Sequence, residues 1–219
     1  MPERTTTEVR HPRIRTFHGR HGRVTSQMRR ALDELAPRFS PRRRGGDRPL
    51  VLEVGCGNGE AALAFADAHP ELDVLAMDVH APGVAQLLLA LEDEPRDNVF
   101  AVHGDALEVL DDELGPGSLH GVHAFFPDPW PKARHHKRRL VRPDVVELLA
   151  DRLAAGGALL LATDADDYAA AARELLDADP RFAGGPADRP AWRPRTTYEA
   201  KAVAAGRAVH ELAYRRAAG

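Results

Sequence analysis

Short apolar runs alternate along the chain with segments in which apolar residues recur at helical spacing. The runs predict strands at Leu50 to Val54, Leu72 to Val79, Asn98 to Val102, Leu119 to Phe126, Ala158 to Thr163 and Ala208 to Arg215. The segments between them predict helices at Glu60 to Ala68, Pro82 to Glu92, Pro143 to Leu153 and Asp166 to Leu176. This alternation is typical of an α/β domain in which parallel strands are joined by crossover helices.

The crossovers decide where a ligand site belongs. Because they are right-handed, the carboxyl ends of the parallel strands collect at one edge of the sheet, where such sheets bind ligands. The polar residues that directly follow each strand are therefore the candidate site residues.

A glycine-rich turn follows the first strand in the sequence LEVGCGNG, with Gly55, Gly57 and Gly59 at alternate positions. Bare backbone there lets a ligand approach closely. The dinucleotide fingerprint requires a further glycine at the position of Glu60, and the acids Glu53 and Glu60 suit no pyrophosphate. This disfavours a nicotinamide or flavin site. An ordinary tight strand-to-helix turn is the alternative.

Acidic residues stand at the ends of successive predicted strands: Glu53, Asp78 and Asp105. Each alone is compatible with a helix cap or a surface charge. Together they describe an adenosine pocket, in which Asp78 accepts the ribose hydroxyls and Asp105 faces the adenine amino group. Carboxylates also favour a cationic sulfonium over a diphosphate. The constellation resembles that of class I S-adenosylmethionine-dependent methyltransferases.

The fourth predicted strand runs into a turn that holds one acid between prolines, Pro127-Asp128-Pro129, followed by Trp130. The prolines fix the backbone and remove two amide donors, so the Asp128 carboxylate is presented rigidly, as suits a substrate-facing acid. The alternative is a structural turn with Trp130 as a core residue.

Charge is segregated along the chain. Thirty Lys and Arg against 33 Asp and Glu give a net charge of −3, yet residues 1–44 hold twelve Arg and four acids. Residues 132–142 add six Lys or Arg and no acid. Beside a small-molecule pocket, such a stretch is typical of phosphate-backbone contacts, with a solvated charge run as the alternative. The adjacent His135 and His136 diverge and lack further ligands at metal spacing, so we expect no metal site.

A specific family resemblance rests on the sequence FPDPWPK, from Phe126 to Lys132, continuing into RHHKRRL. It resembles the signature of the bacterial tRNA (guanine-N7)-methyltransferases. Weaker matches extend over about Arg13 to Arg215, including ATD from Ala162 and TTYE from Thr196. The resemblance implies a Rossmann-like class I methyltransferase fold with a mostly parallel seven-stranded sheet and helices on both faces. It implies methyl transfer from S-adenosylmethionine to N7 of the guanine at position 46 in the tRNA variable loop.

The resemblance also implies roles for individual residues. It assigns methyl-donor contacts to Glu53, Asp78, Asp105 and Asp128, beside the glycines Gly55, Gly57 and Gly59, and makes Asp128 the catalytic acid. It assigns substrate contacts to Lys132, Asp164, Thr196, Thr197, Tyr198 and Glu199. It assigns RNA contacts to Arg134, His135, His136, Lys137, Arg138 and Arg139. Asp78 departs from the family, which usually has Glu there. Asp164 and Glu199 are both candidates to accept the guanine N1 and N2 protons, a donor pair that adenine lacks.

The remaining expectations concern organisation and location. We expect a basic arm and helix over residues 1–44 and the methyltransferase domain over residues 45–219. A single cysteine, Cys56, an Arg-rich start and the lack of an apolar run of about 20 residues favour the cytoplasm and exclude a membrane span. Whether the protein is a monomer or a homodimer stays open, as do two other readings: a methyltransferase of this fold with another acceptor, and a non-catalytic RNA-binding module.

Overall fold

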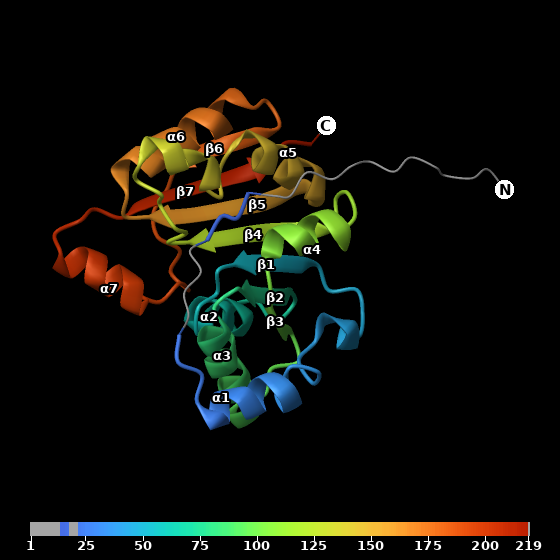
Figure 1. Cartoon of the computed structure of the whole chain (residues 1–219). Helices are drawn as coiled ribbons and strands as arrows, with labels where there is room; N and C mark the ends of the chain where they lie inside the picture. Colours follow the sequence, from blue (N-terminus) through green and yellow to red (C-terminus); the bar gives the residue numbers. More distant parts are fainter. Residues whose placement is uncertain (1–13, 18–21, 219) are drawn as a thin grey trace.

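One seven-stranded sheet organises the protein in the computed structural model, which describes residues 14–17 and 22–218 (Figure 1). Its strand order is β3-β2-β1-β4-β5-β7-β6. All neighbouring strands are parallel except β7, which runs antiparallel to β5 and β6. The strands are β1 (Leu50–Val54), β2 (Asp73–Asp78), β3 (Val99–His103), β4 (Leu119–Phe125), β5 (Leu153–Thr163), β6 (Phe182–Pro186) and β7 (His210–Arg216). The predicted mostly parallel sheet is confirmed.

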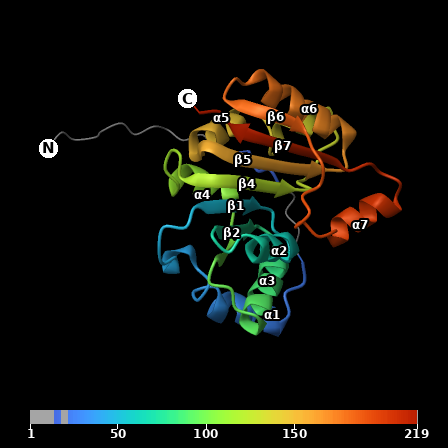
Figure 2. The same ribbon diagram turned by 180° about the vertical axis from the view of Figure 1, so that it is seen from behind.

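Helices cover both faces of the sheet, as predicted (Figures 1 and 2). The apolar sides of α4 (Ala106–Asp112), α5 (Pro143–Arg152) and α6 (Asp166–Ala178) share one core with the strands. A second core, on the other face, is formed with α2 (Glu60–Ala68) and α3 (Ala81–Asp93). Pro143 opens α5, where its missing N–H has no helical partner to lose.

The segment before β1 packs against α3. It comprises α1 (Ser26–Arg30), a single π-helical turn η1 (Ala31–Leu35) and a 3-10 turn η2 (Pro41–Arg43). Ala31 and Leu35 are buried in the α2 and α3 core, and Arg30 forms an ion pair with Glu92 of α3 at 2.5 Å. Residues 1–13 and 18–21 of the predicted basic arm lie outside the described residues, and the domain boundary after residue 44 stays a prediction.

Most predicted elements agree with the structure within two residues, and β1 and α2 have the predicted bounds. The predictions are wrong at one junction: Leu153 is the first residue of β5 and not the last of the preceding helix, so this strand begins five residues before the predicted Ala158. The chain leaves α5 directly into an extended conformation there, and Gly156, with φ of 78°, interrupts the early part of the strand. In the described ranges no helix combines the length and apolarity that a bilayer crossing requires.

The carboxyl ends of the parallel strands lie at one edge of the sheet, on the left in Figure 1. The last helix, α7 (Thr197–Ala204), projects beyond this edge. Strands β1 and β4 are neighbours, with Glu53 in register with His123. The glycine turn after β1 and the proline turn after β4 therefore leave the sheet side by side.

Candidate active site

The glycine turn between β1 and α2 has left-handed backbone at all three predicted glycines. Gly55, Gly57 and Gly59 have φ values of 78°, 57° and 84°, which side chains other than glycine rarely adopt. A Cβ atom on Gly59 would lie 2.4 Å from Cδ1 of Leu87, so this glycine also lets α3 pack. At Gly55 and Gly57, by contrast, a Cβ would have no described atom within 4 Å. The turn thus offers open space directly above bare backbone.

Asp78, at the end of β2, holds this turn in place. Its Oδ2 accepts a hydrogen bond from the Gly57 amide at 2.8 Å, and its Oδ1 accepts one from the His80 amide at 2.7 Å. Each carboxylate oxygen has a second lone pair, so these bonds leave acceptor capacity for a ligand. The contact to ribose predicted for Asp78 stays a prediction, and the shorter side chain has a structural function as well.

Asp105, after β3, is the N-cap of α4. Its Oδ1 accepts a hydrogen bond from the Leu107 amide at 3.0 Å, which satisfies one of the free donors of the first helical turn. The carboxylate therefore stands at a fixed place on the same sheet edge as Asp78. The predicted contact to adenine is compatible with this position and is not tested by it.

Glu53, near the end of β1, is a buried carboxyl with an unsatisfied atom. Its side chain is 3% exposed, and Oε2 has no hydrogen-bond partner among the described residues. Burial, aided by the negative charge of Asp78 and opposed by the positive charge of Arg193, raises the pKa of Glu53 to about 8. A buried acceptor without a partner is costly. A ligand that brings a donor or a positive charge to this point relieves that cost.

These observations together test whether the residues fit S-adenosylmethionine. Open space above Gly55 and Gly57, an unpartnered buried acceptor at Glu53 and a carboxylate at the end of β2 occupy one corner of the sheet edge. This set suits a nucleoside that carries a positive charge, and the residues fit the group.

The proline turn after β4 is closed at both ends by strained residues. Phe126 and Trp130 have φ of 53° and 45°, in the left-handed region that bulky side chains avoid. The Phe126 amide donates to the Ala162 carbonyl oxygen at 2.7 Å, and the Trp130 Nε1 donates to the Thr16 carbonyl oxygen at 2.8 Å. Asp128, half-buried, stands in the middle of this constrained turn. Trp130 is itself buried. The turn is therefore rigid, as expected for one that presents a substrate-facing acid, and it also places Trp130 in the core, as expected for a structural turn.

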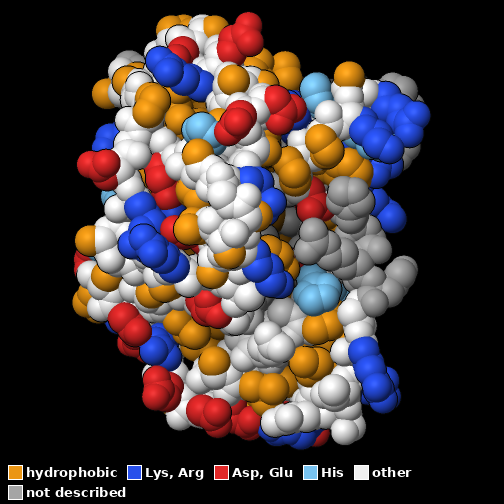
Figure 3. Space-filling view, turned by 90° about the vertical axis from the view of Figure 1, so that its left-hand side faces the viewer, with side chains coloured by type: hydrophobic (Ala, Val, Ile, Leu, Met, Phe, Trp, Pro, Cys, Tyr) orange, Lys and Arg blue, Asp and Glu red, His pale blue; other side chains and the backbone are white. Residues whose placement is uncertain are grey.

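The basic stretch after this turn divides into exposed and buried members. The side chains of Lys132, Arg134 and Lys137 are exposed on or beside η3 (Ala133–Arg138). The Arg138 guanidinium lies 4.7 Å from the centre of the Trp130 ring, whereas Arg139 is buried. Figure 3 looks onto this edge of the sheet and shows Lys and Arg side chains on several sides of a hollow. His135 packs edge-on against Trp130 at 5.7 Å, and His136 lies 3.9 Å from Asp167.

The predicted substrate residues lie at the end of β5 and the start of α7. Asp164 Oδ2 accepts a hydrogen bond from Arg207 Nε at 2.7 Å. Thr196 caps α7, and its hydroxyl accepts from the Glu199 amide at 3.3 Å. The neighbouring Thr197 is exposed, as is Tyr198, whose side chain is 54% accessible. The structure thus brings these residues to the edge that carries the glycine and proline turns.

Glu199 lies differently from its neighbours, because it is buried and paired. Its Oε2 lies 2.9 Å from the Arg193 guanidinium, which is itself 0% exposed. Arg193 is not among the predicted site residues. It follows a proline-rich segment with no helical or strand pattern, and its only sequence signal is that it stands three residues before Thr196.

An aromatic cluster beneath the site is likewise absent from the sequence prediction. His123 of β4 is buried and stacks on Trp192 with ring centres 5.4 Å apart. Burial lowers the pKa of His123 to about 3, so the ring is neutral. Phe65 and Phe125 pack around the same pair. The cluster supports the floor of the edge between β1 and β4.

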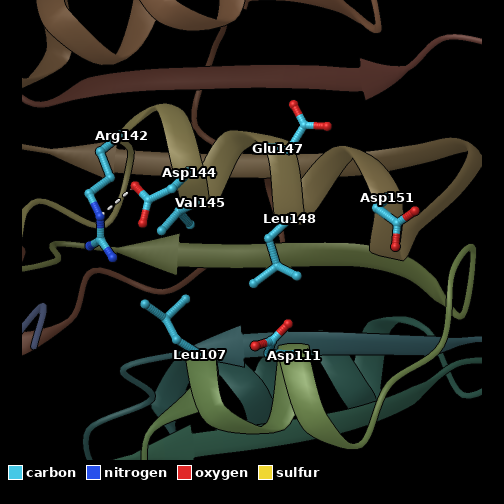
Figure 4. A pocket seen from close by; sticks show the side chains of 8 residues that line it. All are labelled: Leu107, Asp111, Arg142, Asp144, Val145, Glu147, Leu148 and Asp151. Atoms are coloured by element: carbon cyan, nitrogen blue, oxygen red, sulfur yellow. Dashed lines mark hydrogen bonds and ion pairs between the residues drawn. The ribbon is translucent and has the colours of Figure 1, made fainter. Parts of the chain in front are cut away.

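The structure also has a groove of about 400 Å³ away from this edge, between α4 and α5 (Figure 4). Acidic side chains of both helices line it, among them Asp111, Asp144 and Glu147. Arg142, at its end, forms an ion pair with Asp144 at 2.7 Å. None of the predicted site residues lines the groove, so it is separate from the candidate active site.

The strand order, the glycine turn after β1 and the acids at successive strand ends define the class of protein: an S-adenosylmethionine-dependent methyltransferase of class I fold. Among solved structures, the 16S rRNA methyltransferase KamB has a TM-score of 0.57 at 15% identity, covering 85% of this chain and 93% of its own. This similarity supports the fold.

The particular family follows from the sequence relatives. Residues 47–212 match the family Methyltransf_4, described as "Putative methyltransferase". A tRNA (guanine-N(7)-)-methyltransferase of Xanthomonas oryzae pv. oryzae is 42% identical over 100% of this chain and 92% of its own length. One of Thiobacillus denitrificans is 44% identical over 94% of this chain and 96% of its own. The chain belongs to the tRNA (guanine-N7)-methyltransferase family, as the FPDPWPK motif predicts.

Proposed function

We propose that this protein transfers a methyl group from S-adenosylmethionine to N7 of the guanine at position 46 in the variable loop of tRNA. The observation that carries the proposal is the rigid placement of Asp128. It stands between two residues of positive φ, in the turn that follows β4, and β4 is the neighbour of β1, which carries the open glycine turn. Family membership supports the donor, the acceptor atom and the RNA class.

The donor half of the site comprises the glycine turn and the three strand-end acids. Gly55 and Gly57 provide bare backbone, Asp78 the ribose acceptor, Asp105 a carboxylate for the adenine and Glu53 a buried acceptor. When bound, S-adenosylmethionine supplies an electrophilic methyl group on a positively charged sulfur. Asp78 and Asp105 hold the nucleoside. The positive sulfur favours the ionised form of Glu53, because a carboxylate stabilises a cation most where water is excluded.

The acceptor half has a different requirement. Guanine N7 already has a lone pair in the plane of the ring, so no proton is removed before it attacks. During transfer the positive charge moves onto the purine. A fixed carboxylate beside the base stabilises that charge and keeps N7 in line with the methyl group, and Asp128 is placed for this role. Its two flanking prolines keep it from relaxing away.

Selection of guanine falls to the acids at the end of β5 and near α7. Asp164 is partly accessible and has one oxygen on Arg207, which leaves acceptor capacity for the N1 and N2 protons of guanine. Glu199 is buried on Arg193. The exposure of the two acids therefore favours Asp164 as the acceptor at the guanine edge.

The tRNA is held by the exposed basic residues. Lys132, Arg134 and Lys137 form a cationic rim next to the proline turn, suited to phosphate contacts. The target guanine must turn out of the tRNA core so that its N7 can face the methyl group. Tyr198 is an exposed aromatic residue that can stack on the turned-out base. Trp130 is buried, which removes it from that role. We place this reaction in the cytoplasm.

The decisive experiment is transfer of labelled methyl from S-adenosylmethionine to unmodified tRNA, followed by identification of the labelled nucleoside. We expect 7-methylguanosine, and loss of label when position 46 of the tRNA transcript is changed to adenine. Label in another nucleoside would favour the same fold with a different acceptor. Binding of tRNA without any transfer would favour a non-catalytic RNA-binding module.

A further inference from the structure

The most deeply buried charge near the site belongs to a residue that no part of the proposed reaction uses. Arg193 is 0% exposed at its side chain and lies between two carboxylates. Its guanidinium forms ion pairs with Glu199 of α7, at 2.9 Å, and with Glu211 of β7. The carbon at the centre of the guanidinium also lies 4.9 Å from the ring centre of Phe125 and 5.8 Å from that of Phe126.

These contacts join parts of the site that are distant in sequence. Phe125 and Phe126 lead directly into the turn that holds Asp128, whereas Glu199 belongs to the first turn of α7, beside Thr196 and Tyr198. Glu211 lies in β7, which pairs with β5 just before Asp164. The positive charge of Arg193 also acts on Glu53 on the donor side, where it partly offsets the rise in pKa that burial causes. One guanidinium therefore contacts the catalytic strand end and the start of the substrate segment.

The ion pairs of Arg193 with Glu199 and Glu211 hold these three side chains in one arrangement. A buried charge is tolerated only when it is paired, and removing one partner leaves the others uncompensated. Without Arg193, the Glu199 and Glu211 carboxylates face each other in a mostly buried place. Arg189 remains near Glu199, at 4.0 Å, but its side chain is 36% exposed and only partly compensates the two charges. Their repulsion then acts on the junction between α7 and β7. The planar guanidinium holds both acids in one geometry, which a flexible ammonium does not reproduce.

We propose that Arg193 is a positioning residue, and that Glu199 acts through Arg193 and not by contact with the guanine. On this proposal, which rests on the proposed function, Arg193 fixes the start of α7 against the Phe126 end of the catalytic turn. The methyl acceptor is thereby held in line with Asp128. A displacement of about 1 Å between the two halves of such a site costs on the order of a hundredfold in rate.

The first measurement is the methylation rate of Arg193→Gln, Arg193→Lys and Glu199→Gln with unmodified tRNA. We expect kcat to fall about a hundredfold for Arg193→Gln, with partial recovery in Arg193→Lys. KM for tRNA should stay within about threefold, because phosphate contacts are retained. Arg173→Gln removes an exposed Arg from an ion pair on α6 and is the matched control, with wild-type kcat expected. A wild-type kcat in Arg193→Gln would overturn the proposal.

The second measurement separates an indirect role of Glu199 from direct reading of the base. If Glu199 acts only through Arg193, the double variant Arg193→Gln/Glu199→Gln is no slower than Arg193→Gln alone. If the two effects multiply, Glu199 has its own contact with the substrate and the proposal is wrong. If thermal melting shows that Arg193→Gln does not fold, Glu199→Gln replaces it in the proteolysis experiment described next. Trypsin cleavage of Glu199→Gln at the wild-type rate would contradict the proposal.

A third measurement is independent of methyl transfer. Lys201 and Arg207 are exposed trypsin sites on and just after α7. We expect cleavage at these residues to be about tenfold faster in Arg193→Gln than in wild type or Arg173→Gln, because the base of α7 is released. Equal cleavage rates would contradict the positioning role. If wild-type protein methylates a different nucleoside, the proposed function fails while this measurement still reports on Arg193.

Discussion

The Arg139 guanidinium donates a hydrogen bond from Nε to the carbonyl oxygen of Pro129 at 3.0 Å. A second nitrogen of the same group forms an ion pair with Asp167, and the guanidinium carbon lies 5.0 Å from the centre of the Tyr168 ring. Arg139 comes from the predicted RNA-contacting stretch, yet it is 3% exposed. It tethers the turn of Asp128 to α6. The basic stretch therefore has exposed members and at least one buried structural member, and variants can separate the two groups.

The exposed members of the stretch should control the salt dependence of tRNA binding. Neutralising Arg134 or Lys137 to Gln is expected to reduce the slope of log affinity against log salt by about 0.7 to 0.9 for each phosphate interaction that the variant removes. Both side chains are exposed, so the fold should be unaffected. Titrations of tRNA at several salt concentrations give the slope, and an unchanged slope would remove these residues from the interface.

Arg139→Gln is the matched contrast to those variants. Because its side chain is internal, we expect the same salt slope as wild type but slower methylation and lower stability. Asp167 is 55% exposed, so water screens the ion pair and its loss costs about 1 kcal/mol or less. Loss of the hydrogen bond to the Pro129 carbonyl oxygen adds about 1 kcal/mol. A reduced salt slope with normal turnover in this variant would show that Arg139 turns outward to bind RNA.

Asp128→Ala should lower turnover by about a hundredfold or more. Removing a fixed carboxylate beside the developing positive charge takes away about 2 to 4 kcal/mol of transition-state stabilisation. Single-turnover rates with saturating S-adenosylmethionine are the measurement. Asp93→Ala, an exposed acid at the end of α3, is the control and should retain wild-type rates. Near-normal turnover in Asp128→Ala would refute the assignment.

Two glycines of the same turn should respond differently to alanine. Gly59→Ala places a methyl group 2.4 Å from Leu87 Cδ1, so we expect a decrease in unfolding free energy of about 2 kcal/mol from overpacking and backbone strain. Gly57→Ala meets open space and should cost about 1 kcal/mol of stability through backbone strain alone. It should, however, weaken S-adenosylmethionine binding by about tenfold or more, because the methyl group enters the cofactor space. Chemical denaturation measures the stability of both variants, and calorimetric titration measures their affinity for S-adenosylmethionine. An affinity of Gly57→Ala equal to that of wild type would contradict a cofactor pocket above this turn.

The pKa of Glu53 predicts a pH dependence of stability in the cofactor-free protein. Burial raises this pKa from 4.5, the value expected for the unfolded chain, to about 8. Between these values the folded state holds a proton that the unfolded state has released, so stability falls as pH rises through this range and then levels off. The slope contributed by this one group is at most about 1.4 kcal/mol per pH unit.

Denaturant unfolding at a series of pH values spanning this range tests the dependence. Glu53→Gln removes the proton exchange and should flatten the profile by that amount, whereas Glu108→Gln, on the exposed side of α4, should leave it unchanged. Parallel profiles for wild type and Glu53→Gln would show that Glu53 ionises normally in the folded protein.

Sequence patterns predict those helices and strands whose ends are set by neighbouring residues. β1 and α2 have the predicted bounds because an apolar run and a glycine stop are both visible in sequence. α4 escapes prediction because it is only seven residues long and is set by the Asp105 cap. α7 escapes it because few of its residues are buried, so it lacks an apolar face. Strand β6, sequence FAGGP, contains two glycines and a proline and is ordered by pairing with β7.

Site residues divide in the same way. Strand-end position and motif spacing place Glu53, Asp78 and Asp128 at one edge. They do not indicate that Asp78 holds the glycine turn or that Arg139 points inward. The role of Arg193 cannot be predicted from the sequence, because its burial depends on carboxylates six and eighteen positions away and on an aromatic ring of β4. Only the tertiary fold brings these groups together.

Trp130 and Trp192 are the only tryptophans of the chain, one in the turn that holds Asp128 and the other in the aromatic cluster beneath the site. The Trp130 indole is hydrogen-bonded to the Thr16 carbonyl oxygen and covered by Arg138, while Trp192 stacks on His123 below the sheet edge. Intrinsic fluorescence therefore reports on both places, and the emission of each tryptophan can be measured separately by replacing the other. Trp192→Phe leaves emission from the catalytic turn alone, so RNA docking can be timed without attaching a dye.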